Sequence, residues 1–218
     1  MRFQKLHAMP TTDLLPANVP PRHLDLGCGA APRNPYRQSE LYGVDIRAFG
    51  IDPRFEFRAA NLTLEAIPFN DGFFGSVSAF DFLEHVPRVL FTPAGAGTRF
   101  PFIDLMSEVW RVLAPGGRFY ALTPAYPHPQ AFQDPTHVNV ITDLTHEYFC
   151  GEQPYGANYG FVGRFHAHRA EWVVSRDAEV ATPFTLQQRM RRWRRRIKGQ
   201  LSHVLWELEA VKPAAPGR

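Results

Sequence analysis

The sequence predicts an α/β fold built around a parallel β-sheet. Short apolar runs alternate with helical stretches along the 218 residues, which is typical of parallel strands joined by crossovers. The run from His23 to Gly29 is an apolar strand that ends in Asp25 and a Gly-x-Gly turn. A second run, from Leu41, ends in Asp45. Acidic strand ends beside such a turn indicate a sheet that binds a nucleoside, so we expect an adenosine-containing cofactor.

Composition favours one domain. With 44% hydrophobic and 13% aromatic residues, the chain can bury one substantial core without a metal or a disulfide. Cys28 and Cys150 form no C-x-x-C pair, so neither a disulfide framework nor a cysteine-rich zinc site is indicated. We find no segment typical of a signal peptide or a membrane span. These features predict a cytoplasmic protein.

The elements follow in order along the chain. Four prolines in residues 1–21 predict an N-terminal arm, and the domain is expected to span 22–212. Strands are predicted at 23–27, 41–46, 55–62, 75–83 and 117–124. Apolar residues at helical spacing predict a helix from Phe102 to Leu113, which Pro115-Gly116-Gly117 ends. A second helix is expected over 143–150, with Thr142 as N-cap and Gly151 as its stop.

Two elements are predicted near the C-terminus. Residues 183–199 form a basic amphipathic helix in which Thr185 and Gln188 make a capping box. Its apolar face carries Leu186, Met190, Trp193, Ile197 and Leu201. Residues 203–212 then alternate between apolar and charged side chains, which predicts an antiparallel edge strand. The tail, 213–218, is expected to be disordered.

The glycine turn favours one kind of nucleoside ligand over another. Pro32 stands where the dinucleotide fingerprint needs a third glycine, which argues against NAD or FAD. Asp45 follows Gly27 at nearly the spacing of an acid that accepts hydrogen bonds from ribose hydroxyls. The alternative for Asp45 is a strand-end carboxylate that caps a turn. Pro32 and Pro35 leave room for only a turn or so of helix, so backbone amides of the turn are expected to face the ligand.

Four motifs, DLGCG, YGVDI, AIPFNDGFFGSVSAFDFLEHV and EVWRVLAPGGRFYALTP, occur in this order. Together they resemble the motif set of class I S-adenosylmethionine-dependent methyltransferases, in particular the small-molecule, methyltransferase type 11-like group. The resemblance runs from about residue 22 to 212. It implies a Rossmann-like, doubly wound, seven-stranded sheet that is mostly parallel with the last strand antiparallel. It also implies S-adenosylmethionine as cofactor.

The resemblance places cofactor-binding residues at the ends of the first four strands. They are Asp25, Gly27 and Gly29 around the methionine part, Asp45 at the ribose, Asn61 and Leu62 at the adenine, and Phe80 and Asp81 beside the methyl donor. Asn61 stands where the family often has Asp, but an amide also offers a donor and an acceptor to an adenine edge.

The loop from 125 to 139 is the predicted acceptor site, because it follows the fifth strand at the ligand-binding edge of the sheet. His137 is the first candidate for a general base and His128 the second, since imidazole titrates near neutral pH. Asp134, Asn139 and His85 are predicted substrate contacts. Alternatively, Asp134 and His137 form a structural turn or bind a metal. Because no third ligand is evident, no metal site is predicted.

The predicted reaction is methyl transfer to a small-molecule or glycan-like acceptor, at oxygen. The alternatives are an RNA methyltransferase and a non-catalytic protein that binds the cofactor. No separate RNA-binding module is visible in the sequence.

The basic helix holds seven cations and no acid: Arg189, Arg191, Arg192, Arg194, Arg195, Arg196 and Lys198. The net charge of the chain is +3 and the whole chain has 24 Lys and Arg, so outside this helix acids outnumber bases. The helix could lie on an anionic membrane or bind a lipid-linked substrate. It could also pack its apolar face on the sheet and leave the arginines solvated. Nucleic acid is the least favoured partner, and the oligomeric state is not predicted.

Overall fold

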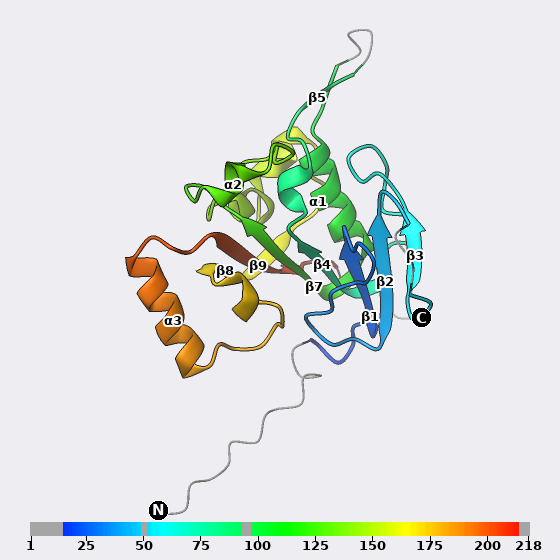
Figure 1. Ribbon diagram of the computed structural model, residues 1–218. Coiled ribbons are helices and arrows are strands. Elements are labelled where there is room, and N and C mark those ends of the chain that lie inside the picture. The colour runs from blue at the N-terminus through cyan, green and yellow to red at the C-terminus, as the bar shows by residue number, and fades with distance from the viewer. Residues whose placement is uncertain (1–14, 49–51, 93–96, 214–218) are drawn as a thin grey trace, which may run out of the picture.

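The computed structural model describes residues 15–48, 52–92 and 97–213 (Figure 1). Its centre is one seven-stranded sheet whose strands are β1 Arg22–Leu26, β2 Glu40–Asp45, β3 Glu56–Ala59, β4 Phe74–Phe80, β7 Leu113–Pro124, β8 Phe165–Val173 and β9 His203–Ala210. The strand order is β3-β2-β1-β4-β7-β9-β8. β1, β2, β3, β4 and β7 are parallel, whereas β9 is antiparallel to both of its neighbours. This arrangement confirms the predicted fold class.

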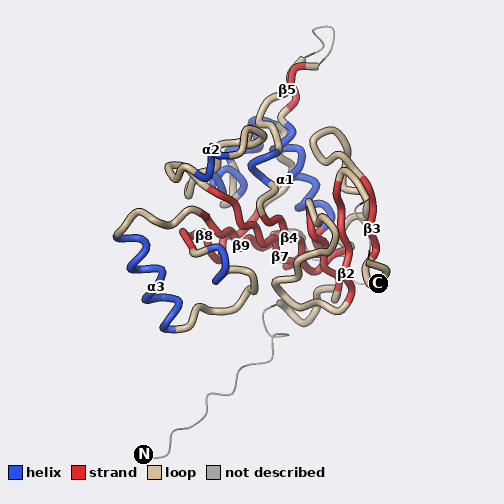
Figure 2. Tube along the Cα trace, viewed as in Figure 1, coloured by secondary structure: helices blue, strands red, loops and turns tan. Residues whose placement is uncertain are grey.

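Helices and a small hairpin complete the fold. They are α1 Pro101–Val112, α2 Gln130–Gln133, α3 Leu186–Ile197, the 3₁₀ helices Leu83–His85, Thr145–Phe149, Tyr155–Tyr159 and Ser175–Asp177, and the hairpin of β5 Leu90–Phe91 with β6 Thr98–Arg99. Residues 27–39, between β1 and β2, run as turns and irregular backbone, drawn as loop in Figure 2. In this connection Pro32 and Pro35 disfavour a helix. In the part of the chain that the structure describes, no helix is long and apolar enough to cross a membrane.

Two hydrophobic clusters cover the two faces of the sheet. α1 buries Phe102, Met106 and Val109 against the larger cluster, as its helical spacing predicted. Phe119 belongs to this cluster and Tyr120 to the other, because neighbouring residues of a strand face opposite sides. Leu15 is buried in the second cluster. The described end of the predicted arm, 15–21, therefore starts against the core, while residues 1–14 lie outside the described residues.

Several predicted elements need correction. β9 does not lie at the edge of the sheet: it is inserted between β7 and β8, as the family resemblance implied. The edge strand next to β9 is β8. Its side chains are mostly half-buried or exposed, so its sequence shows little apolar alternation. The second helix is only a short 3₁₀ helix, Thr145–Phe149. Pro115-Gly116-Gly117 lies inside β7, where the register with β4 shifts. Of the predicted tail, 214–218 lies outside the described residues.

Helix α3 begins at its predicted cap. The Thr185 Oγ1 atom accepts a hydrogen bond from the Gln188 backbone N–H at 3.2 Å, and the Thr185 backbone N–H donates to Gln188 Oε1 at 2.8 Å. This reciprocal pair satisfies two backbone donors at the helix start. Every side chain of the helix is exposed or half-buried, so the predicted alternative in which the apolar face packs on the sheet is wrong.

Candidate active site

The glycine turn and Asp45 meet at the carboxyl edge of β1 and β2. Gly27 and Gly29 have φ angles of +67° and +57°, a region that favours glycine. The Gly29 backbone N–H donates to Asp45 Oδ2 at 2.9 Å. The Gly27 N–H donates to the Val44 carbonyl at 2.8 Å. The structure therefore brings the glycine turn and Asp45 together, and Asp45 caps the turn, as the alternative for this residue states.

The two glycines differ in what surrounds them. A Cβ atom on Gly27 would lie 2.6 Å from Phe82 Cδ2. A Cβ on Gly29 would meet no described heavy atom within 4 Å. The turn thus packs tightly on one side and opens on the other, next to the Asp45 carboxylate. Open space beside a carboxylate fits the nucleoside part of S-adenosylmethionine. The amides of Gly27, Cys28 and Gly29 donate to Val44 and Asp45, so the expectation that they face the ligand is wrong.

Asp25 lies beneath the turn and not in this open space. Its Oδ1 accepts a hydrogen bond from Ser78 Oγ at 2.5 Å, and its Oδ2 accepts one from the Arg33 backbone N–H at 2.8 Å. Ser78 Oγ also lies 2.9 Å from His23 Nε2. Burial raises the pKa of Asp25 to about 7 and lowers the pKa of His23 to about 3. The expected contact of Asp25 with the methionine part is therefore corrected: the carboxylate shapes the turn.

The remaining predicted cofactor residues end β3 and β4. Asn61 Oδ1 accepts from the Thr63 N–H at 3.1 Å, and Leu62 is buried beside it. Phe80 is buried, and its carbonyl accepts a hydrogen bond from the Arg33 guanidinium at 3.0 Å. Sequence reasoning missed Arg33, which sits in the irregular loop after the glycine turn.

Asp81 has an unusual backbone, with φ at +50°. Its exposed carboxylate lies 3.1 Å from His203 Nε2. His203 starts β9 and pairs in register with Pro124, at the end of β7. Sequence reasoning missed His203, although the inserted last strand implied by the family would have brought its first residue to this edge.

A cleft of about 540 Å³ lies at the same edge. It is lined by Asp81, Glu84, Pro124, Gln130, Gln133, Asp134, Pro135, His137 and His203. The structure therefore brings together Asp81, Asp134 and His137 from the predicted site. It adds Glu84, for which the sequence allows either a substrate contact or a helix-start residue that interacts with the helix dipole.

His137 stands beside Glu84 in the cleft wall. The distance from His137 Nε2 to Glu84 Oε1 is 3.9 Å. Glu84 is 1% exposed, and its Oε2 accepts a hydrogen bond from Thr123 Oγ1 at 2.8 Å. Its Oε1 has no hydrogen-bond partner among the described residues. Burial raises the pKa of Glu84 to about 7, so the carboxyl exchanges its proton near neutral pH.

Other predicted residues surround this pair. The His85 ring centroid lies 4.8 Å from that of His137, and His85 Nδ1 lies 3.0 Å from Thr136 Oγ1. Asp134 accepts hydrogen bonds from Thr136, which lower the pKa of its carboxyl.

Glu84, His85 and His137 have ligand atoms within 4.8 Å of one another, so these three could also hold a divalent cation. Asp134 is not part of this group, in contrast to the metal alternative read from the sequence.

Two predicted site residues have other roles. His128 Nδ1 accepts a hydrogen bond from the Gln130 N–H at 3.3 Å, and His128 does not line the described cleft. Asn139 is 2% exposed. Its amide donates to the Leu83 carbonyl at 3.1 Å and accepts from Arg88 Nε at 2.6 Å. His128 thus pairs with the first backbone N–H of α2, and Asn139 fixes the loop instead of contacting substrate.

Comparison with known proteins indicates one family. Residues 24–121 match a family model described as a methyltransferase domain. In these residues and in its fold, the chain is similar to the class I S-adenosylmethionine-dependent methyltransferases. This methyltransferase uses S-adenosylmethionine as cofactor. No curated protein matches it.

Solved structures share the fold of this methyltransferase. The methyltransferase in complex with the Haloferax volcanii Trm112 activator is 15% identical, with a TM-score of 0.58 over 94% of this chain and 89% of that one. A geranyl diphosphate methyltransferase in complex with SAM is 18% identical, with a TM-score of 0.53 over 92% and 83%. The [4+2]-cyclase SpnF is 15% identical, with a TM-score of 0.53 over 93% and 79%. Since a cyclase shares it, the fold alone does not determine the reaction.

Proposed function

We propose that this methyltransferase transfers a methyl group to a hydroxyl oxygen of a small-molecule or glycan-like acceptor bound in the cleft. The observation that carries the proposal is the position of His137 Nε2, 3.9 Å from the buried Glu84 carboxylate. A hydroxyl acceptor must lose a proton as its oxygen gains the methyl group. A histidine beside a buried carboxylate is suited to take that proton.

Different residues of the chain have different roles in the proposed reaction. The glycine turn and Asp45 would hold the cofactor, which would supply an electrophilic methyl group and leave as a neutral sulfide. His137 Nε2 takes the proton that the acceptor hydroxyl loses as its oxygen gains this methyl group. Glu84 then stabilises the resulting imidazolium. Because the leaving sulfide is neutral, no acid is needed, and alignment of the reactants can supply roughly 7–11 kcal/mol.

A methyl-transfer screen with isotopically labelled cofactor tests the acceptor class. We expect transfer to sugar and small hydroxyl acceptors. Transfer only to amines would contradict the oxygen assignment, and transfer only to RNA would favour the alternative acceptor class. Tight cofactor binding without transfer to any acceptor would favour a non-catalytic role.

Variants test the base. His137→Ala and Glu84→Gln should each lower kcat by about 10²–10⁴-fold while calorimetry shows unchanged affinity for S-adenosylhomocysteine. His166→Ala, an exposed histidine on β8, is the matched control and should leave both values unchanged. If His137→Ala turned over normally from pH 6 to pH 9, the base assignment would be wrong.

The pH profile gives an independent readout. With the Glu84 pKa raised to about 7, the carboxyl is neutral below that pH and ionised above it. The wild-type rate should therefore rise with pH through about 7, and Glu84→Gln should flatten this limb. Activity measured with EDTA tests the metal alternative. If EDTA abolished activity and an added divalent metal restored it, Glu84, His85 and His137 would bind a cation instead.

A further inference from the structure

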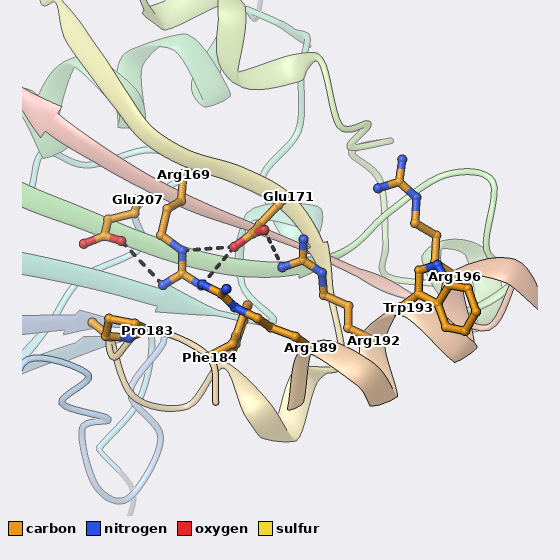
Figure 3. A pocket seen from close by; sticks show the side chains of 10 residues that line it. Arg169, Glu171, Pro183, Phe184, Arg189, Arg192, Trp193, Arg196 and Glu207 are labelled. Carbon is orange, nitrogen blue, oxygen red and sulfur yellow. Dashed lines mark hydrogen bonds and ion pairs between the residues drawn. The ribbon is translucent and has the colours of Figure 1, made fainter. Parts of the chain in front are cut away.

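Helix α3 leaves its apolar face exposed, and Trp193 at one border of that face also lines a pocket of about 580 Å³ beside β8 (Figure 3). Its four apolar side chains form one stripe at helical spacing, and all are exposed: Leu186 at 77%, Met190 at 45%, Trp193 at 58% and Ile197 at 66%. An amphipathic helix of a globular protein normally buries this stripe in the core. Here the stripe is a surface feature that needs another explanation.

Charged contacts hold the opposite face of the helix to the body. Arg191 forms an ion pair with Asp177 at 2.9 Å, and Arg192 forms one with Glu171 on β8. Figure 3 shows the Arg192 side chain directed toward Glu171, and its guanidinium lies 5.4 Å from the centre of the Phe184 ring. The polar attachments thus fix which face points outward.

Further cations border the outward stripe. At about 100° per residue, Arg194 falls on one side of the stripe. Arg189 and Arg196 fall on the other side, where they also line the pocket beside β8. These three form no ion pair within the described part of the chain, and all three are exposed. The outward surface therefore combines a narrow apolar row with positive charge on both sides, and α3 contains no acid to offset it.

We propose that α3 docks the protein on an anionic lipid bilayer. The apolar stripe would lie at the boundary between headgroups and acyl chains, with the flanking arginines at the lipid phosphates. The arginines favour a partner with negative charge. The exposed Leu, Met, Trp and Ile side chains favour a partner that also offers an apolar interior, as a lipid bilayer does. A nucleic acid would use the arginines but not the aliphatic side chains.

Docking through α3 also positions the cleft. The helix ends at Ile197, and residues 198–202 lead directly to His203 in the cleft wall. The six Cα–Cα steps from Ile197 to His203 span at most about 22 Å. Docking therefore holds the acceptor cleft close to the membrane surface, where a lipid-linked acceptor would lie. That consequence for the substrate rests on the proposed function, whereas the docking itself does not.

Vesicle co-sedimentation of the full chain tests the proposal. We expect binding to vesicles of phosphatidylcholine with phosphatidylglycerol, little binding to phosphatidylcholine alone, and weaker binding as salt rises from about 0.1 M to about 0.5 M because exposed charges are screened. Equal binding to both vesicle types, or binding to neither, would overturn it. Salt-sensitive binding to RNA in the absence of vesicle binding would assign α3 to nucleic acid.

Paired variants separate the two contributions. Trp193→Ser with Ile197→Ser removes apolar area, and Arg194→Glu with Arg196→Glu reverses two flanking charges. Each pair should weaken binding to anionic vesicles about tenfold or more. The matched controls change exposed residues elsewhere: Leu64→Ser with Val89→Ser, and Arg54→Glu with Arg164→Glu.

The controls should bind vesicles like the wild type, and all four variants should keep their affinity for S-adenosylhomocysteine. Equal losses in variants and controls would contradict a role for α3. The affinity for S-adenosylhomocysteine reports on the cofactor site alone. It therefore separates a loss of membrane docking from a failure of the proposed function.

Discussion

Two neighbouring glycines show how closely the cofactor turn depends on single atoms. Both adopt positive φ angles, so a side chain at either costs roughly 1–2 kcal/mol. Only Gly27 also faces an atom that a Cβ would overlap, Phe82 Cδ2 at 2.6 Å. At Gly27 the turn therefore packs directly against Phe82, in the segment after β4. At Gly29 the turn has no such contact.

We predict unequal effects of one extra methyl group at the two positions. Gly29→Ala should lower the free energy of unfolding by about 1–2 kcal/mol, and Gly27→Ala by about 1–3 kcal/mol more, because Phe82 must move. Urea denaturation measures both losses. If both variants lost the same free energy of unfolding, Phe82 would be able to move aside without destabilising the protein.

Residue types at strand ends could be predicted from the sequence, but their surroundings could not. Asp25 lies within the first predicted strand and Asp45 near the end of the second. Ser78 and Arg33 enclose Asp25, whereas Asp45 borders the open turn. Glu84 depends on Thr123 and His137, which are distant in sequence. Enclosure is a property of tertiary packing, so a single motif does not show it.

At the scale of elements, α1 and α3 have the same length and similar apolar spacing but opposite environments. α1 buries Met106 completely, whereas the equivalent residue type in α3, Met190, is 45% exposed. The sequence predicted both helices. It could not show which apolar stripe meets the core. In α3 the arginines that pair with Asp177 and Glu171 face the protein, and the apolar stripe is left exposed.

The same substitution in the two helices should therefore have different costs. Met106→Ala should lower the free energy of unfolding by about 2–5 kcal/mol, since it leaves a cavity. Met190→Ala should change it by no more than about 0.5 kcal/mol. Denaturation midpoints of the two variants provide the comparison. A large loss for Met190→Ala would show that α3 packs on the body after all.

Strand β8 shows the limit of pattern reasoning. Its alternation is obscured because its side chains are half-buried at the sheet edge, and His166, Arg169 and Glu171 interrupt the apolar residues. β9 alternates more clearly, yet its place inside the sheet came from the family resemblance and not from its own sequence. Patterns predict that a strand exists, whereas its neighbours are fixed by the whole chain.

At the scale of the whole molecule, five parallel strands bring the glycine turn, Asp45 and the acceptor cleft to one edge of a single sheet. A ligand at that edge contacts loops from several strands at once, so its binding should stabilise the complete domain. The missing third glycine, replaced by Pro32, had already argued against a dinucleotide.

We therefore predict a selective thermal shift. S-adenosylhomocysteine at 100 times its Kd should add about 2.7 kcal/mol to the free energy of unfolding, which raises the melting temperature by roughly 5–10 °C for a domain of this size. NAD at the same concentration should give no shift. Asp45→Ala should reduce the shift, because the carboxylate beside Gly29 is lost, while Asp52→Ala, at an exposed turn, should retain it. A shift with NAD, or an unchanged shift in Asp45→Ala, would show that the ligand does not occupy the open side of the glycine turn.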